Sequence, residues 1–226
     1  MKFGHLGSAA WLLIGAAAAL RASDGTWIAP GGGVWSDTAN WQDQAVAEGS
    51  GATATFAAAG GAVNNDMTGL ALRGVQLGGA GYTFAGNALA LDAAGFITVL
   101  GGSHTVGLPL TLGGDTAVTA APGTALALDG DIDGAGGLTL TGAQFSLVGA
   151  NTFAGPFTHV RGIVSFADTV ALGLNAAPAV LGEGAFRYTG PSAAFARGLT
   201  LRAGVQAATN RAAVIDITYP AATLTV

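Results

Sequence analysis

Residues 125–147 read ALALDGDIDGAGGLTLTGAQFSL, and this stretch decides the fold. Leucine, isoleucine and phenylalanine alternate in it with alanine, threonine, serine and aspartate. Successive side chains of a β-strand point to opposite faces, so this alternation is typical of strands with one buried face. Glycine interrupts the pattern every few residues and supplies the positive φ angles that tight turns need. The stretch therefore predicts short strands joined by turns.

The same alternation recurs along the chain, and no run at helical period follows residue 24. It is found at residues 88–92, 137–141, 144–147, 215–219 and 223–226. Short words also repeat, since ALALD stands at 88–92 and 125–129, and TFAG stands at 83–86 and 152–155. The spacings share no common period, which favours a solenoid with rungs of about 20 residues over a propeller with equal blades. A β-sandwich shows the same alternation and stays as the alternative fold.

The composition excludes several classes of function. Of 226 residues, 9% are charged, the formal net charge is −5 and there is no cysteine. A nucleic-acid partner is not expected without a basic face, and a disulfide framework or thiolate metal site needs cysteine. The single lysine, Lys2, excludes a P-loop and a Schiff-base lysine in the body of the chain. No cofactor is expected from the sequence.

The first 22 residues have the pattern of a secretory signal peptide. Lys2 precedes an apolar run at residues 9–20, and small residues stand near Ala22. We predict cleavage after Ala22, with the region around Ala19 as the alternative. As a helix this run would be about 18 Å long, short of the roughly 30 Å hydrocarbon core. No later stretch is long and uncharged enough to span a membrane. The predicted organisation is a signal peptide at 1–22, a Trp-rich N-terminal cap and first rung at 23–60, and β-helix rungs at 61–226.

Two neighbouring segments resemble a known repeat. Residues 132–143 read IDGAGGLTLTGA and residues 147–155 read LVGANTFAG. Together they resemble the autotransporter-associated β-strand repeat, whose pattern is a GxGGLTKTG-like stretch followed by LxGANTYTGxTxV. Leu140 stands where the family has lysine, and Phe153 stands where it has tyrosine. FRYTG at 186–190, RGLTL at 197–201 and the Trp-rich start are similar to segments that accompany the repeat.

The resemblance implies a right-handed parallel β-helix that is exported and exposed at a bacterial surface, and it implies no catalytic residues. In such a fold one rung cannot bury its own apolar face, so neighbouring rungs stabilise each other and the end rungs need caps.

Three aspartates form a candidate metal site. Asp129, Asp131 and Asp133 match the opening of a calcium loop, but the twelfth loop position is Leu140, where an EF-hand has a bidentate glutamate. In an extended segment the outer two carboxylates would lie about 13 Å apart, too far to share one ion. The favoured interpretation is a solvated acidic row, with weak calcium binding as the alternative.

Three tryptophans form a candidate carbohydrate site. Trp27, Trp35 and Trp41 crowd the predicted first rung. They could form a platform on which sugars stack, or an N-terminal cap over the open end of the solenoid. The cap is favoured because the architecture requires one.

The remaining chemical groups do not combine into a catalytic motif. His104 and His159 are expected at surface or turn positions, and Ser103 cannot pair with His104 because strand neighbours point to opposite faces. Arg187 and Arg197 could serve a polysaccharide lyase, with Glu183 as the carboxylate close to them in sequence. The favoured interpretation places both arginines on the outer strand face, covering it with their stems.

The sequence therefore predicts a secreted or outer-membrane-associated, non-enzymatic β-helix of the autotransporter passenger type, which serves as a surface stalk, scaffold or adhesion module. The alternatives are a carbohydrate-active β-helix and a small sugar-binding module. The expected partner is a surface glycan or a protein ligand. Residues 215–226 end in strand-like alternation without a polar cap, which predicts either end-to-end self-association or a C-terminal continuation.

Overall fold

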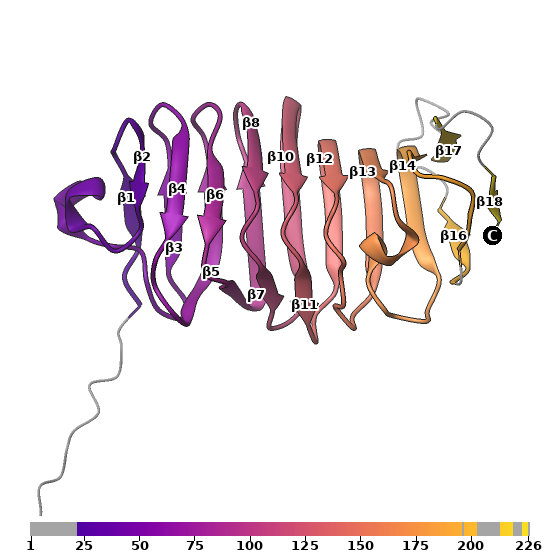
Figure 1. The fold of residues 1–226 in the computed structure, drawn as a ribbon, viewed down its shortest axis with the longest axis horizontal. Helices are drawn as coiled ribbons and strands as arrows, with labels where there is room; N and C mark the ends of the chain where they lie inside the picture. Colours follow the sequence, from indigo (N-terminus) through magenta and orange to yellow (C-terminus); the bar gives the residue numbers. More distant parts are fainter. Residues whose placement is uncertain (1–21, 196, 203–212, 219–222, 226) are drawn as a thin grey trace, which may run out of the picture.

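The computed structural model describes residues 22–195, 197–202, 213–218 and 223–225. Its strands lie side by side along the long axis of the molecule, and the chain advances along that axis from the indigo end to the yellow end (Figure 1). They form about seven stacked turns of a β-solenoid. Within the described ranges every strand pair is parallel, which confirms the parallel solenoid. The β-sandwich alternative is wrong, because its sheets would be antiparallel.

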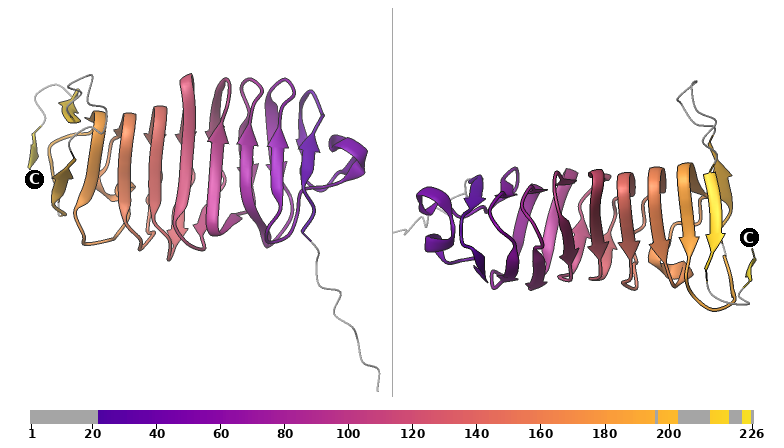
Figure 2. Two further views of the ribbon diagram at one scale, coloured as in Figure 1. Left: turned by 180° about the vertical axis from the view of Figure 1, so that it is seen from behind. Right: turned by 90° about the horizontal axis from the view of Figure 1, so that it is seen from above.

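One continuous path of paired strands runs along the solenoid, and it includes the longest strands (Figures 1 and 2). In order of pairing these are β1 (Gly25–Trp27), β3 (Thr53–Phe56), β5 (Leu70–Leu77), β7 (Leu89–Val99), β10 (Thr116–Leu128), β12 (Leu138–Leu147), β13 (Phe157–Phe166), β14 (Ala179–Tyr188) and β16 (Leu199–Leu201).

The remaining strands complete the rungs. They are β2 (Gly31–Val34), β4 (Gly61–Asn65), β6 (Thr83–Gly86), β8 (Ser103–Val106), β9 (Leu110–Leu112), β11 (Ile132–Gly134) and β17 (Ala213–Ile217), with β15 (Ala193–Ala194) and β18 (Leu224–Thr225) as a separate pair.

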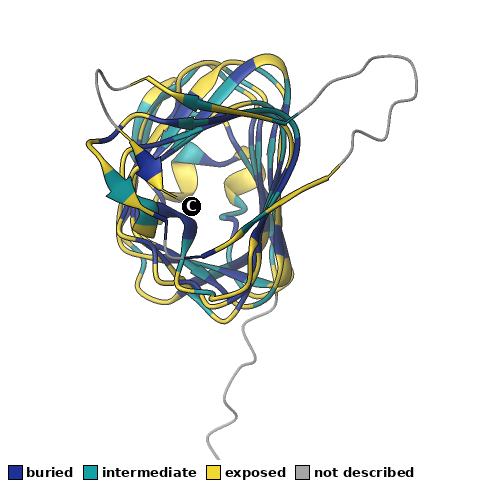
Figure 3. Cartoon of the chain, turned by 90° about the vertical axis from the view of Figure 1, so that its right-hand side faces the viewer, coloured by how far each residue is buried: buried dark blue, intermediate teal, exposed yellow. Residues whose placement is uncertain are grey.

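The core is a set of columns in which equivalent residues of successive rungs stack on one another. One column runs through Ala54, Val75, Ile97, Val118, Leu140, His159 and Leu181, all of them buried. Viewed end-on, the buried positions alternate with exposed positions around the wall (Figure 3). Each buried aliphatic side chain contributes roughly 1.5–3 kcal/mol relative to an exposed one. Stability therefore comes from contact between rungs rather than within a rung.

The register fixes the length of a rung. Leu70 pairs with Leu89, and Phe96 pairs with Ala117, so about 20 residues make one turn, as the sequence predicts. The long strands bend near their middle, where the register also shifts. Gly162 and Gly184 pair with each other at this bend with φ angles of 101° and 112°. A side chain at Gly162 would overlap the carbonyl of Gly142 on the preceding rung, so the bend requires glycine.

The helical content of the described residues is three short 3-10 turns: η1 (Thr38–Asn40), η2 (Gln42–Gln44) and η3 (Thr169–Leu172). The first two lie at the N-terminal end of the solenoid, where the indigo coil extends beyond β1 (Figure 1). Residues 1–21 of the predicted signal peptide lie outside the described part of the chain. Among the residues that are described, no helix is long and apolar enough to cross a membrane.

The C-terminal strand β17 is less buried than the sequence predicts. Ile215 and Ile217 of β17 stand in register with Phe186 and Tyr188 of β14, yet they are 41% and 38% exposed. In the described residues β17 pairs with β14 alone, so one side of these isoleucines has no rung against it. The predicted strand alternation is present here, but it does not bury the apolar face.

Candidate functional site

The three tryptophans form a closed cluster around Phe56 at the N-terminal end of the core. Trp27 and Trp41 meet edge to face with ring centroids 5.1 Å apart, and Trp35 lies 5.2 Å from Trp41. The exposed fraction of each tryptophan is at most 1%. A sugar stacks on an exposed ring face, so these residues form no stacking platform in this structure, and that alternative from the sequence is wrong.

The polar edges of the same indoles are satisfied by backbone carbonyls. The Nε1–H groups of Trp27, Trp35 and Trp41 donate to the carbonyls of Ala29, Ala47 and Trp35 at 3.0, 2.9 and 2.7 Å. A buried indole that keeps its hydrogen bond adds its large apolar area to the core without leaving a donor unpaired. The cluster thus has the packing of a core element.

The three aspartates lie on the outer surface near the corner between β10 and β11. Asp129, Asp131 and Asp133 are exposed, while Leu128 before them and Ile132 between them are buried. Asp131 accepts a hydrogen bond of 2.9 Å from the Ala150 amide. Within the part of the chain that the structure describes, no three histidine, cysteine or acidic residues gather to hold a metal ion. The solvated acidic row stays the favoured prediction for these residues, with weak calcium binding as its untested alternative.

His104 and His159 are both buried, so their expected surface or turn positions are wrong. The Tyr82 amide donates to Nδ1 of His104 at 3.2 Å, and Nε2 of His104 lies 2.6 Å from the Gly101 carbonyl. Ser103 is exposed on the opposite face, which agrees with the strand parity. His159 has a different environment, because its Nε2 is buried without a hydrogen-bond partner among the described residues. Burial lowers the pKa of the His159 imidazole below its usual value of 6.5.

The two arginines also differ from each other. Nε of Arg187 lies 2.9 Å from the carboxylate of Asp216 on the next rung, in a pair about one-third exposed. Arg197 is 7% exposed, and it donates to the carbonyls of Ala177 and Leu172 at 2.9 and 2.7 Å. Its expected place on the outer strand face is therefore wrong, and it acts inside the fold as a link between loop carbonyls.

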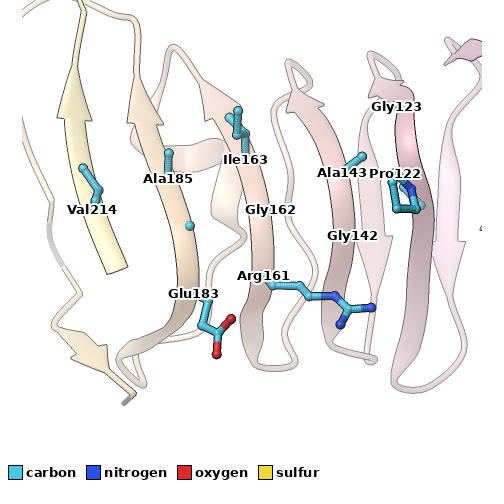
Figure 4. Close-up of a pocket in the computed structure, with 12 residues that line it drawn as sticks. Pro122, Gly123, Gly142, Ala143, Arg161, Gly162, Ile163, Glu183, Ala185 and Val214 are labelled. Carbon is cyan, nitrogen blue, oxygen red and sulfur yellow. The ribbon is translucent and has the colours of Figure 1, made fainter. Parts of the chain in front are cut away.

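A groove with a volume of about 980 Å³ lies along the side of the solenoid. We call it the side groove. It crosses five neighbouring strands, β10, β12, β13, β14 and β17, and therefore runs along the rod axis (Figure 4). Its lining residues are Ala120, Pro122, Gly123, Gly142, Ala143, Arg161, Gly162, Ile163, Glu183, Gly184, Ala185 and Val214.

The glycine bend produces this groove. The strands turn at Gly142, Gly162 and Gly184, and no side chain rises there to fill the corner. One charged group of each sign stands on the groove. Arg161 and Glu183 are register partners on β13 and β14, although their sequence numbers are far apart. The sequence placed Glu183 close to Arg187 and Arg197; the fold pairs it with Arg161 in register instead.

Sequence comparison gives one relative and no family model. The chain is 33% identical over 191 aligned residues to the adhesin BmaC autotransporter of Brucella suis biovar 1 (strain 1330). The alignment covers 71% of this chain but only 5% of the length of that protein. Neither a family model nor a solved structure matches the chain. The similarity to an autotransporter adhesin and the parallel β-solenoid together fit an autotransporter passenger-like protein.

Proposed function

We propose that the protein is an exported, non-enzymatic surface module that mediates adhesion through the side of its β-helical rod. The observation that carries this proposal is the 33% sequence identity to an autotransporter adhesin over 71% of the chain. A stack of rungs is stiff, because each rung is hydrogen-bonded to its neighbours through parallel strands. Such a rod holds its side face away from the cell and offers repeated contacts along it.

The composition of the side groove supports binding over cleavage. A polysaccharide-cleaving groove on this fold would carry three or more clustered carboxylates beside an arginine or lysine. The groove is lined by one carboxylate, Glu183, and one guanidinium, Arg161, among glycine and aliphatic residues. This favours adhesion over the carbohydrate-active alternative.

Adhesion is tested with beads coated with the purified full chain and washed over cultured host cells and over immobilised extracellular matrix. We expect retention above that of albumin-coated beads, and loss of retention when the coating is denatured first. Retention equal to that of albumin on every surface contradicts the proposal. Release of new reducing or unsaturated sugar ends from polysaccharides would instead favour the enzyme.

Export is a separate part of the proposal, since the adhesin relative suggests a cell-surface or secreted location. We expect N-terminal sequencing of the protein recovered from outside the cytoplasm to begin at Ser23. An intact Met1 on surface-exposed material would contradict cleavage after Ala22.

A further inference from the structure

The side groove has two unlike walls. On one side Ala143, Ile163, Ala185 and Val214 follow one another along the rod, about one per rung, and present small or aliphatic side chains (Figure 4). Ile163, Ala185 and Val214 are direct register partners. This wall is therefore a continuous apolar strip.

The opposite wall carries the two charged side chains of the groove. Arg161 and Glu183 line the groove, and they continue a row of outward-facing register partners that runs through Thr98, Thr119 and Thr141 beyond the lining of the groove. Two of these hydroxyls already meet, since Oγ1 of Thr119 donates to Oγ1 of Thr98 at 3.3 Å. Neighbouring strands lie about 4.8 Å apart, so a molecule running along the rod meets one polar group at each such step.

The positive charge in the groove is turned toward the ligand space. The side chain of Arg161 extends along the axis over β12, whereas the carboxylate of Glu183 points away from the apolar strip (Figure 4). The ion pair found within the described ranges is Arg187 with Asp216, so Arg161 has no carboxylate within salt-bridge distance there. An exposed guanidinium is suited to a carboxylate, which it can bind through two parallel hydrogen bonds.

These features fit a sugar chain better than a peptide. The side chains on one face of an extended peptide recur about every 6.6–6.8 Å, which does not match a rung step of about 4.8 Å. Strands β12, β13 and β14 are paired on both sides, so they offer no free edge to which a peptide strand could be added. A linear glycan advances by close to one rung step per sugar, and each sugar has a C–H face for the apolar strip and polar groups for Arg161 and Glu183 on the other wall.

We propose that the side groove binds a linear acidic glycan, lying along the rod axis, with a sugar carboxylate paired to Arg161. This inference rests on the proposed adhesive function and names its ligand class. The groove crosses five strands, and four steps of about 4.8 Å give a length of about 19 Å. We therefore expect affinity to rise with chain length up to about four sugars and then to level off.

The test is calorimetry of the full-chain protein with oligogalacturonates of two to six sugars, and with a neutral linear hexasaccharide as the comparison. Arg161→Gln removes the charge at an exposed position and should weaken binding of the acidic hexasaccharide about tenfold or more. Arg73→Gln removes the same charge at an exposed position on β5, outside the groove, and should leave binding unchanged. Ala185→Trp fills the groove and should abolish binding, with circular dichroism confirming that the fold is retained.

The inference is overturned if the Arg161→Gln and Arg73→Gln variants bind the acidic hexasaccharide equally well. It is also overturned if the wild-type protein binds the neutral and acidic hexasaccharides equally well. Absence of binding to any of the sugars by wild-type protein also overturns it. The bead assay tests the adhesive function separately from the glycan. If the coated beads still adhere when the sugars do not bind as expected, the adhesive function stands and its ligand is of another class, such as a protein. Beads that do not adhere count against the proposed function itself.

Discussion

The indole Nε1–H of Trp41 donates a hydrogen bond of 2.7 Å to the backbone carbonyl of Trp35, whose own indole lies against it. This contact joins the 3-10 segment at residues 38–44 to the first turn of the core. We expect Trp35→Ala to lower the free energy of unfolding by about 3–5 kcal/mol, because a fully buried ring is lost and a cavity remains. Leu174→Ala, at a 65% exposed position, serves as the control and should have little effect in the same thermal melt. A melting temperature unchanged by Trp35→Ala would contradict the structural role of the cluster.

His159 should make the fold sensitive to mild acid. Its pKa is lowered in the folded state, so the unfolded chain binds a proton more readily. The neutral imidazole is tolerated above about pH 6.5, and stability should fall as the pH drops below that value. His159→Leu places leucine between Leu140 and Leu181 and should flatten the dependence between about pH 7.5 and pH 5.

Thr158→Leu is the control for this measurement, because it changes the adjacent, outward position and leaves His159 in place. It should keep the acid dependence of the wild type in urea titrations at several pH values. The same slope in His159→Leu and in the wild type would show that another group carries the effect.

The glycine bend gives a matched pair of substitutions. Gly123 and Gly162 both have positive φ angles, of 80° and 101°, but a methyl group at Gly123 meets no atom within 4 Å. Gly123→Ala should cost about 1–2 kcal/mol, the strain of the backbone conformation alone. Gly162→Ala should cost clearly more, because its methyl group overlaps the Gly142 carbonyl. Urea denaturation checks both, and equal losses would show that the close stacking of the rungs does not limit this position.

The acidic row at Asp129, Asp131 and Asp133 should not act as a strong calcium site. All three side chains are exposed, and Asp131 already accepts a hydrogen bond from Ala150. We expect calorimetry to show no calcium binding tighter than about 0.1 mM, and the Asp131→Asn variant to behave as the wild type does. Binding below that concentration, lost in Asp131→Asn, would establish the calcium site.

Much of the fold could be predicted from the alternation of buried and exposed side chains in the sequence, which we call side-chain parity. Alternation located the strands around residues 88–92 and 137–147, and short repeats gave a rung of about 20 residues. Parity could not tell a solenoid from a sandwich, because it says which face is buried and not which strand lies alongside. It did contain a signal that was missed, since His104 shares parity with Val106 and His159 with Phe157, and all four are buried.

The side groove could not be predicted in the same way. It depends on Arg161 and Glu183 standing in register on neighbouring strands, and on the strands bending together at Gly142, Gly162 and Gly184. The register shifts between Leu140 and Thr141, so counting residues along the sequence would have misaligned the two walls. Arg197 was misplaced for a related reason, because it lies in a connection where no alternation indicates which way a side chain points.

The adhesive account depends on successive rungs stacking in register into a rod. The chain has no cysteine, so pairs of threonines in one outward row can be replaced by cysteine and spin-labelled without background. Thr26, Thr55, Thr98, Thr119 and Thr141 belong to this row. Dipolar electron paramagnetic resonance should give about 10 Å for Thr98 with Thr141, about 19 Å for Thr55 with Thr141 and about 24 Å for Thr26 with Thr141, before the length of the labels is added. Separations that do not grow with each added rung would contradict the rod and the account built on it.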